Sequence, residues 1–225
     1  MNIERVIEFF FEFSYKVLAY VINLVYFIVL TIPLYLIGLL VEGGLIKYAF
    51  LFIPLTALFL VGLKNLVYTS YMILIKKKLY YKPFFWKSLT DDFFRVYSYY
   101  LIVVSLLYFG LTSTYFIINT VSQGFWVLFA LICVLILPNI VFTTLQFALY
   151  EPKPILQTIK NSYILFLMLG VVSLAMTILL GVIIYLFLKN LIMVTVLMPL
   201  YSALYILIYL LIDNKRLKKD RGNYV

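Results

Sequence analysis

The sequence predicts an all-α polytopic membrane protein, a bundle of about six transmembrane helices with an interfacial amphipathic helix at its N-terminus. Of its 225 residues, 66% are hydrophobic and only 12% are charged, whereas a soluble domain is close to half apolar and a quarter charged. Six runs are almost free of charge, and each exceeds the roughly 20 residues that cross ~30 Å of hydrocarbon: 17–41, 48–75, 96–118, 126–150, 163–188 and 191–212. Transmembrane β-strands alternate in polarity and these runs do not, so we expect one helical transmembrane domain over residues 1–225.

Residues 1–16 carry a regular polar stripe. Glu4, Glu8, Glu12 and Lys16 are spaced by four, so they share one face of a helix whose other residues are largely apolar. This pattern predicts an interfacial helix that leads into the first span. A helix that docks on a partner protein is the alternative.

The first and second spans, and the third and fourth, are joined by short links. The turn Glu42-Gly43-Gly44 makes the first two spans an antiparallel hairpin. The link between the third and fourth spans, residues 119–124, is uncharged and therefore fits the outer side of a membrane.

Pro138 and Asn139 lie near the middle of the fourth run. Proline removes one helix hydrogen bond, so we expect a kink and a carbonyl that Asn139 or a neighbouring helix satisfies. A kink required for packing and a ligand site are both compatible with the pattern.

Two connecting segments begin with Lys-Pro, at Lys82 and at Lys153, and both continue towards the sequence VVSL. Because proline suits the first turn of a helix, each is expected to begin a helix that lies on the inner surface and bends into the bilayer. Duplication of a helix pair and coincidence both explain the likeness.

The basic residues predict the orientation. With the N-terminus inside, fifteen of the eighteen Lys and Arg residues lie in cytoplasmic segments, including the tail 213–225, so both termini are expected to be cytoplasmic. The net charge of +9 then faces anionic inner-leaflet lipid, and nucleic acid is not an expected partner. The candidate contacts to inner-face lipid or a partner protein are Lys76, Lys77, Lys78, Trp86, Arg95, Lys215, Arg216, Lys218 and Lys219.

Few residues offer chemistry. The chain has no histidine, and no acidic residue lies within any of the six runs, which disfavours proton-coupled transport, intramembrane aspartyl catalysis and histidine metal sites. Asp91 and Asp92 are expected to form the polar start of the third helix. Cys133 is the single cysteine, so no disulfide is predicted. We therefore expect no catalytic residue, metal or cofactor.

Lys64 is the only ionised residue inside a run, and Asn65 follows it. A lysine at the bilayer centre costs at least ~2.5 kcal/mol on insertion scales. Three arrangements relieve that cost: the ammonium snorkels to a nearby membrane boundary, it lines a polar cavity with Asn65, or it pairs with a buried anionic group. Lys64, Asn65, Pro138 and Asn139 are thus the candidate polar residues of the membrane interior.

The segments LAYVINLVYFIVLTIPLYLIG (18–38), PLTALFLVGLK (54–64) and KPFFWKSLTDDFFR (82–95) resemble the YesL-like family of small bacterial membrane proteins, a family of unknown function. The resemblance covers most of the first hundred residues, and Tyr26 stands where the family usually has tryptophan. It implies that Lys64 is the basic residue that closes the second span. Residues 65–78 would then continue as an interfacial extension.

The resemblance also implies an accessory protein that accompanies carbohydrate ABC-transport systems. We therefore expect an integral accessory or scaffold protein of the bacterial cytoplasmic membrane, with ABC-transporter subunits as partners. A small permease or flippase that acts alone is the alternative, because proline interrupts four of the runs, at Pro33, Pro54, Pro138 and Pro199. An immunity or stress-resistance membrane protein also fits the size and charge. An enzyme is not expected, since no nucleophile, base and orienting acid converge.

Overall fold

The computed structural model describes residues 3–40, 48–76, 84–120, 126–189 and 191–222. These residues form eight α-helices and, within those ranges, no strand: α1 (Ile3–Leu40), α2 (Ala49–Leu74), α3 (Phe84–Thr90), α4 (Phe93–Thr120), α5 (Trp126–Leu149), α6 (Ile155–Leu169), α7 (Val171–Lys189) and α8 (Leu191–Gly222). The predicted all-α polytopic class is confirmed.

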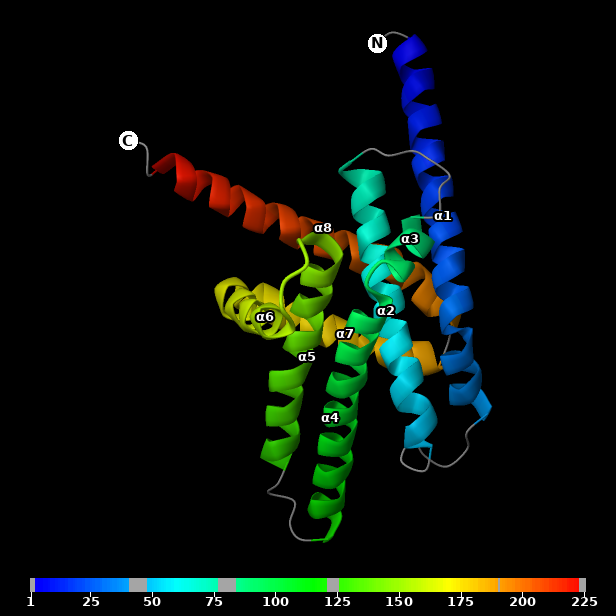
Figure 1. Cartoon of the computed structure of the whole chain (residues 1–225). Helices are drawn as coiled ribbons and strands as arrows, with labels where there is room; N and C mark the ends of the chain where they lie inside the picture. The colour runs from blue at the N-terminus through cyan, green and yellow to red at the C-terminus, as the bar shows by residue number, and fades with distance from the viewer. Residues whose placement is uncertain (1–2, 41–47, 77–83, 121–125, 190, 223–225) are drawn as a thin grey trace.

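The four helices that are long and apolar enough to cross a membrane on their own form the main bundle. Figure 1 shows α1, α2, α4 and α5 as long rods, with α1 antiparallel to α2 and α4 antiparallel to α5. The predicted hairpin of the first two spans is therefore present. α2 is the central helix, since it contacts α1, α3, α4, α5 and α8.

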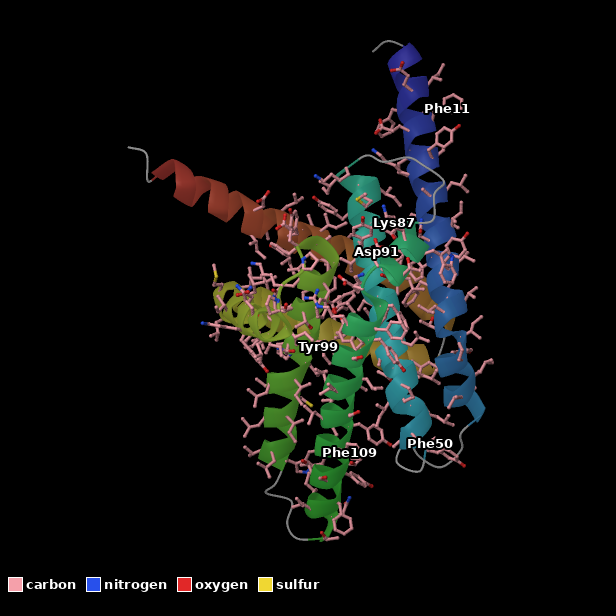
Figure 2. The ribbon with its side chains drawn as sticks, in the orientation of Figure 1. Phe11, Phe50, Lys87, Asp91, Tyr99 and Phe109 are labelled. Carbon is pink, nitrogen blue, oxygen red and sulfur yellow. The ribbon has the colours of Figure 1, made fainter. Side chains whose placement is uncertain are left out.

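Residues 3–16 do not form a separate interfacial helix. They belong to α1, a continuous helix of 38 residues that is about 57 Å long at 1.5 Å per residue. Its N-terminal part projects beyond the other helices (Figure 1), and Phe11 lies on that projection (Figure 2). The polar stripe is present there, with Glu12 paired to Lys16 at 2.6 Å. The stripe was correctly found, but periodicity does not show whether a helix breaks before it enters a span.

The last third of the chain differs most from the prediction. The fifth run bends by 113° where α6 meets α7 at Gly170. Among the described residues, four helices are long and apolar enough to cross a membrane, or five if α6 and α7 form one span. The structure therefore does not confirm the predicted count of six.

Polar contacts join the helices inside an apolar core. The Tyr100 hydroxyl lies 2.7 Å from that of Thr144 and joins α4 to α5. The Ser202 hydroxyl on α8 lies 3.1 Å from both Tyr20 on α1 and Ser70 on α2. In a membrane the hydrophobic effect contributes little to helix association, because lipid tails are as apolar as the side chains. Hydrogen bonds between hydroxyl groups therefore help to hold the helices together.

Candidate functional site

The short helix α3 is held between α1 and α2 by side chains of those two helices. The Phe85 N–H, in the first turn of α3, donates to Asn23 Oδ1 at 3.2 Å. Near the other end, Lys64 Nζ donates to the Ser88 carbonyl and hydroxyl oxygens, each at 2.9 Å. The first N–H and last C=O groups of a helix lack partners within it, so Asn23 and Lys64 cap α3 from outside.

Asn65 completes this arrangement. The Ser88 hydroxyl donates to Asn65 Oδ1 at 2.8 Å, so that Lys64, Ser88 and Asn65 form one chain of hydrogen bonds. Asn23, Lys64, Asn65 and Ser88 are each no more than 6% exposed. We call these four residues the α3 anchor. Asn65 Nδ2 is buried and has no hydrogen-bond partner among the described residues.

The structure places Lys64 in none of the three predicted arrangements. Its side chain is 6% exposed and hydrogen-bonded, so it does not snorkel to a boundary. It also binds Ser88 instead of lining an open cavity. The partner is nevertheless not a buried acid: it is the C-terminal end of α3, where the helix dipole favours a cation.

Asp91 and Asp92 form the turn between α3 and α4, not the first turn of the third span. α3 ends at Thr90 and α4 begins at Phe93. Asp92 has φ of +132°, a backbone conformation that allows the abrupt change of direction. Lys87 and Asp91 lie together beside the upper half of α2 (Figure 2).

The predicted interfacial extension after Lys64 is part of the helical core. α2 continues from Lys64 to Leu74 without a break, a distance of about 15 Å. Leu66, Val67 and Ile73 are at most 1% exposed, because this part of α2 packs against α8, with the Tyr71 and Tyr209 rings 5.3 Å apart. Lys77 and Lys78 lie outside the described residues.

Aromatic rings cover the other face of α3. The Trp86 ring lies 5.6 Å from that of Tyr26 and is 39% exposed, and the Phe85 ring, 6.4 Å from Tyr26, is fully buried. Tyr26 therefore packs directly on the Phe-Trp element whose sequence resembles the YesL-like family.

Pro138 and Asn139 form a separate site between α4, α5 and α6. Pro138 lies inside α5, and the Tyr163 hydroxyl of α6 donates to the Leu135 carbonyl at 3.0 Å, one turn before the proline. The carbonyl that Pro138 leaves without a helix partner is that of Val134, four residues earlier, so this bond to Leu135 tests neither of the two expected arrangements. Asn139 instead accepts a hydrogen bond from Tyr99 through Oδ1, and its Nδ2 has no partner in the described part of the chain.

The predicted inner-face residues are only partly described. Lys76 is exposed and lies 5.8 Å from the centre of the Tyr71 ring. Arg95 makes contacts within the protein: it donates to the Lys153 carbonyl and lies 3.8 Å from Asp92. The tail residues Lys215, Arg216, Lys218 and Lys219 continue α8, but their side chains lie outside the description.

No family model, curated protein or solved structure matches this chain. The YesL-like resemblance therefore stays a prediction. Among the residues that the structure describes, no three His, Cys, Asp or Glu side chains are grouped so as to hold a metal ion.

Sequence reasoning found Lys64 and Asn65 but missed Ser88 and the role of Asn23. A serine in a polar connecting segment carries no signal that it will be buried. An asparagine inside an apolar run is a stronger signal, because its amide must find partners in lipid. Asn23 could have been singled out on that ground.

Proposed function

We propose that this protein is an integral membrane scaffold that presents a fixed helical surface to partner proteins. The observation that carries the proposal is the α3 anchor. In this protein the buried Lys64 ammonium and the Asn23 and Asn65 amides hold α3 in place. In a transporter, buried polar groups of this kind line the path of the solute. The anchor makes α3 a rigid part of the bundle although α3 has only seven residues.

Two projecting helices extend the surface that a partner would meet. The N-terminal part of α1 and the C-terminal part of α8 both reach beyond the bundle (Figure 1). On α1, Phe9, Phe10, Phe11 and Phe13 are between 55% and 65% exposed. At 3.6 residues per turn these rings spread over roughly 200° of the helix, away from the polar stripe of Glu8, Glu12 and Lys16. A partner protein that packs on this apolar face fits the scaffold role.

We place this working surface at the inner face of a bacterial cytoplasmic membrane, with both termini inside. The concentration of Lys and Arg in the N-terminal segment, the two Lys-Pro segments and the tail supports that orientation. Anionic inner-leaflet lipid would surround the basic residues. From the resemblance alone we further propose that the partners are subunits of a carbohydrate ABC-uptake system.

Cross-linking and co-purification from native membranes test the proposal. The informative variant is Phe10→Ala with Phe11→Ala, which removes two exposed rings of α1. The matched control is Phe109→Ala with Phe116→Ala on α4, whose rings are 60% and 68% exposed. We expect the amount of co-purified partner to fall by about tenfold or more in the α1 variant, which corresponds to a loss of about 1.4 kcal/mol of binding free energy. In the control variant the amount should not change. A wild-type protein that purifies alone, or deletion without effect on sugar uptake, would contradict the proposal.

A small permease or flippase is the second candidate. The 113° bend at Gly170 favours it, because discontinuous helices form the substrate sites of many transporters. Flux of sugars, lipids or ions into liposomes that contain only this protein would support the permease. An absence of flux for all three would remove it.

A further inference from the structure

A cavity beside α6 changes from polar to apolar along its length. Its volume is about 440 Å³, within the range of ligand pockets. The segment from Lys153 to Leu169 supplies most of its wall, with help from the end of α5 and from Ile212 of α8. Figure 1 shows α6 at the edge of the bundle, next to α5.

The wall residues are ordered by polarity. Gln157 and Asn161 on α6 and Lys153 just before it are spaced by four, and Leu165 and Leu169 continue the α6 face that carries the two amides. The twelve steps from Gln157 to Leu169 span about 18 Å at 1.5 Å per helical residue. An ammonium, then two amides, then aliphatic side chains match a ligand with an anionic head, a polar neck and a hydrocarbon chain.

The start and the middle of this wall are fixed by hydrogen bonds. Gln146 of α5 donates to the Thr158 carbonyl at 3.0 Å and to the Ser162 hydroxyl at 2.8 Å, which holds α6 against α5. Arg95 of α4 donates to the Lys153 carbonyl and so fixes the backbone that carries the cation. The cavity is therefore part of the packed structure and not a gap beside a loose helix.

The surroundings of the cavity identify the source of the ligand. Leu167 and Met168 on α6 are 77% and 61% exposed. Exposed aliphatic side chains at this density on an apolar helix face lipid. A lipid can thus enter the cavity from the bilayer, with its head at Lys153, an exposed lysine that is the only ionisable cation in the cavity wall.

We propose that the cavity between α5, α6 and α8 binds one anionic membrane phospholipid, with its phosphate at Lys153, its ester and glycerol oxygens at Gln157 and Asn161, and part of one acyl chain against Leu165 and Leu169. This site is separate from the α3 anchor and does not depend on the scaffold function. The lipid would be a resident ligand of the membrane domain.

Native mass spectrometry of the full chain, released from detergent after titration with phosphatidylglycerol or phosphatidylcholine, tests the proposal. We expect one phosphatidylglycerol to be retained per chain, in preference to phosphatidylcholine. Lys153→Gln should weaken retention by at least about tenfold, since it removes a hydrogen bond between the ammonium and the phosphate. Lys160→Gln is the matched control: it removes an exposed lysine of α6 that does not line the cavity.

A second variant and a competitor separate the other outcomes. Leu165→Trp fills the apolar end of the cavity and should also lower lipid retention. A thermal melt checks that this variant folds. If it does not fold, the comparison of Lys153→Gln with Lys160→Gln tests the site. Displacement of the lipid by millimolar inorganic phosphate would overturn the lipid assignment in favour of a free anion. Equal losses in Lys153→Gln and Lys160→Gln, or no retained lipid in the wild type, would overturn the site itself. Co-purification of partners by a protein that retains no lipid would leave the scaffold proposal standing.

Discussion

The Lys64 ammonium lies 2.9 Å from the hydroxyl oxygen of Ser88, a residue 24 positions later in the chain. Through this contact and the bond to the Ser88 carbonyl, α2 holds the C-terminal end of α3. The only lysine of the second span is thus a structural residue that joins two helices.

Ser88→Ala removes two hydrogen bonds of the α3 anchor at once. Lys64 loses one acceptor and Asn65 Oδ1 loses its donor. We expect the free energy of unfolding to fall by about 1–3 kcal/mol, because buried polar groups are left unpaired. Ser105→Ala is the matched control, since the Ser105 hydroxyl bonds only to the Leu101 carbonyl of its own helix; it should change stability by less than about 0.5 kcal/mol. Thermal unfolding in detergent measures both, and equal effects would contradict the anchor.

Asn65→Asp tests whether Lys64 is charged where it lies. The carboxylate would keep the acceptor for Ser88 and remove the unpartnered Nδ2. With Lys64 present the change should be close to neutral, whereas in a Lys64→Met background it buries a lone carboxylate and should be strongly destabilising. A double-mutant cycle should give a favourable coupling of about 0.5–3 kcal/mol. No coupling would mean that Lys64 is neutral in the folded protein.

Gly170→Ala tests the bend between α6 and α7. Gly170 has φ of +50°, and an added Cβ would meet no atom within 4 Å, so any cost comes from the backbone conformation. We expect a loss of about 1–2 kcal/mol. Gly181→Ala is the control in open space inside α7 and should stabilise by about 0.5–1 kcal/mol. If both substitutions stabilise the protein, the bend at Gly170 is absent in solution.

Gly62→Val tests the close approach of α1 and α2. A Cβ at Gly62 would lie 3.0 Å from Phe27 Cδ2, and Phe27 is 1% exposed. Overpacking of this kind should cost about 1–3 kcal/mol. Phe27→Leu in the same chain should recover part of the loss, because it removes the ring that the valine meets. Additive losses in the double variant would show that the two residues do not meet.

Single cysteines test the orientation. In a Cys133→Ala background, the exposed positions Glu8, Asp213 and Tyr48 each receive one cysteine. With both termini inside, an impermeant maleimide should label Tyr48→Cys on intact cells. It should label Glu8→Cys and Asp213→Cys only after permeabilisation. Labelling of Asp213→Cys on intact cells would reverse the assignment of the C-terminus.

The sequence predicts the helical class because lipid leaves few choices for a backbone. Continuous apolar runs must be helices, so α1, α2, α4 and α5 follow almost directly from length and composition. The bend at Gly170 does not, since hydropathy measures the polarity of a run and not its direction. A glycine inside an apolar run was the available signal. Its left-handed conformation is a property of the folded chain.

The candidate site shows the same division. Lys64 and Asn65 stand out because their polarity conflicts with their surroundings, and that conflict predicts that partners exist. It does not predict which partners, since Ser88 lies in a segment of ordinary polar composition. The burial of Lys64 depends on α3 folding back beside α2, which is a tertiary arrangement that no spacing in the sequence encodes.

Because α3 is capped by Asn23 at one end and by Lys64 at the other, its place depends on two helices that are made before it. Both capping residues leave the ribosome before residues 84–90, so Lys64 gains its Ser88 acceptor only when α3 takes its place beside α1 and α2. Arrival of α3 is therefore what turns a costly lysine into a link between helices.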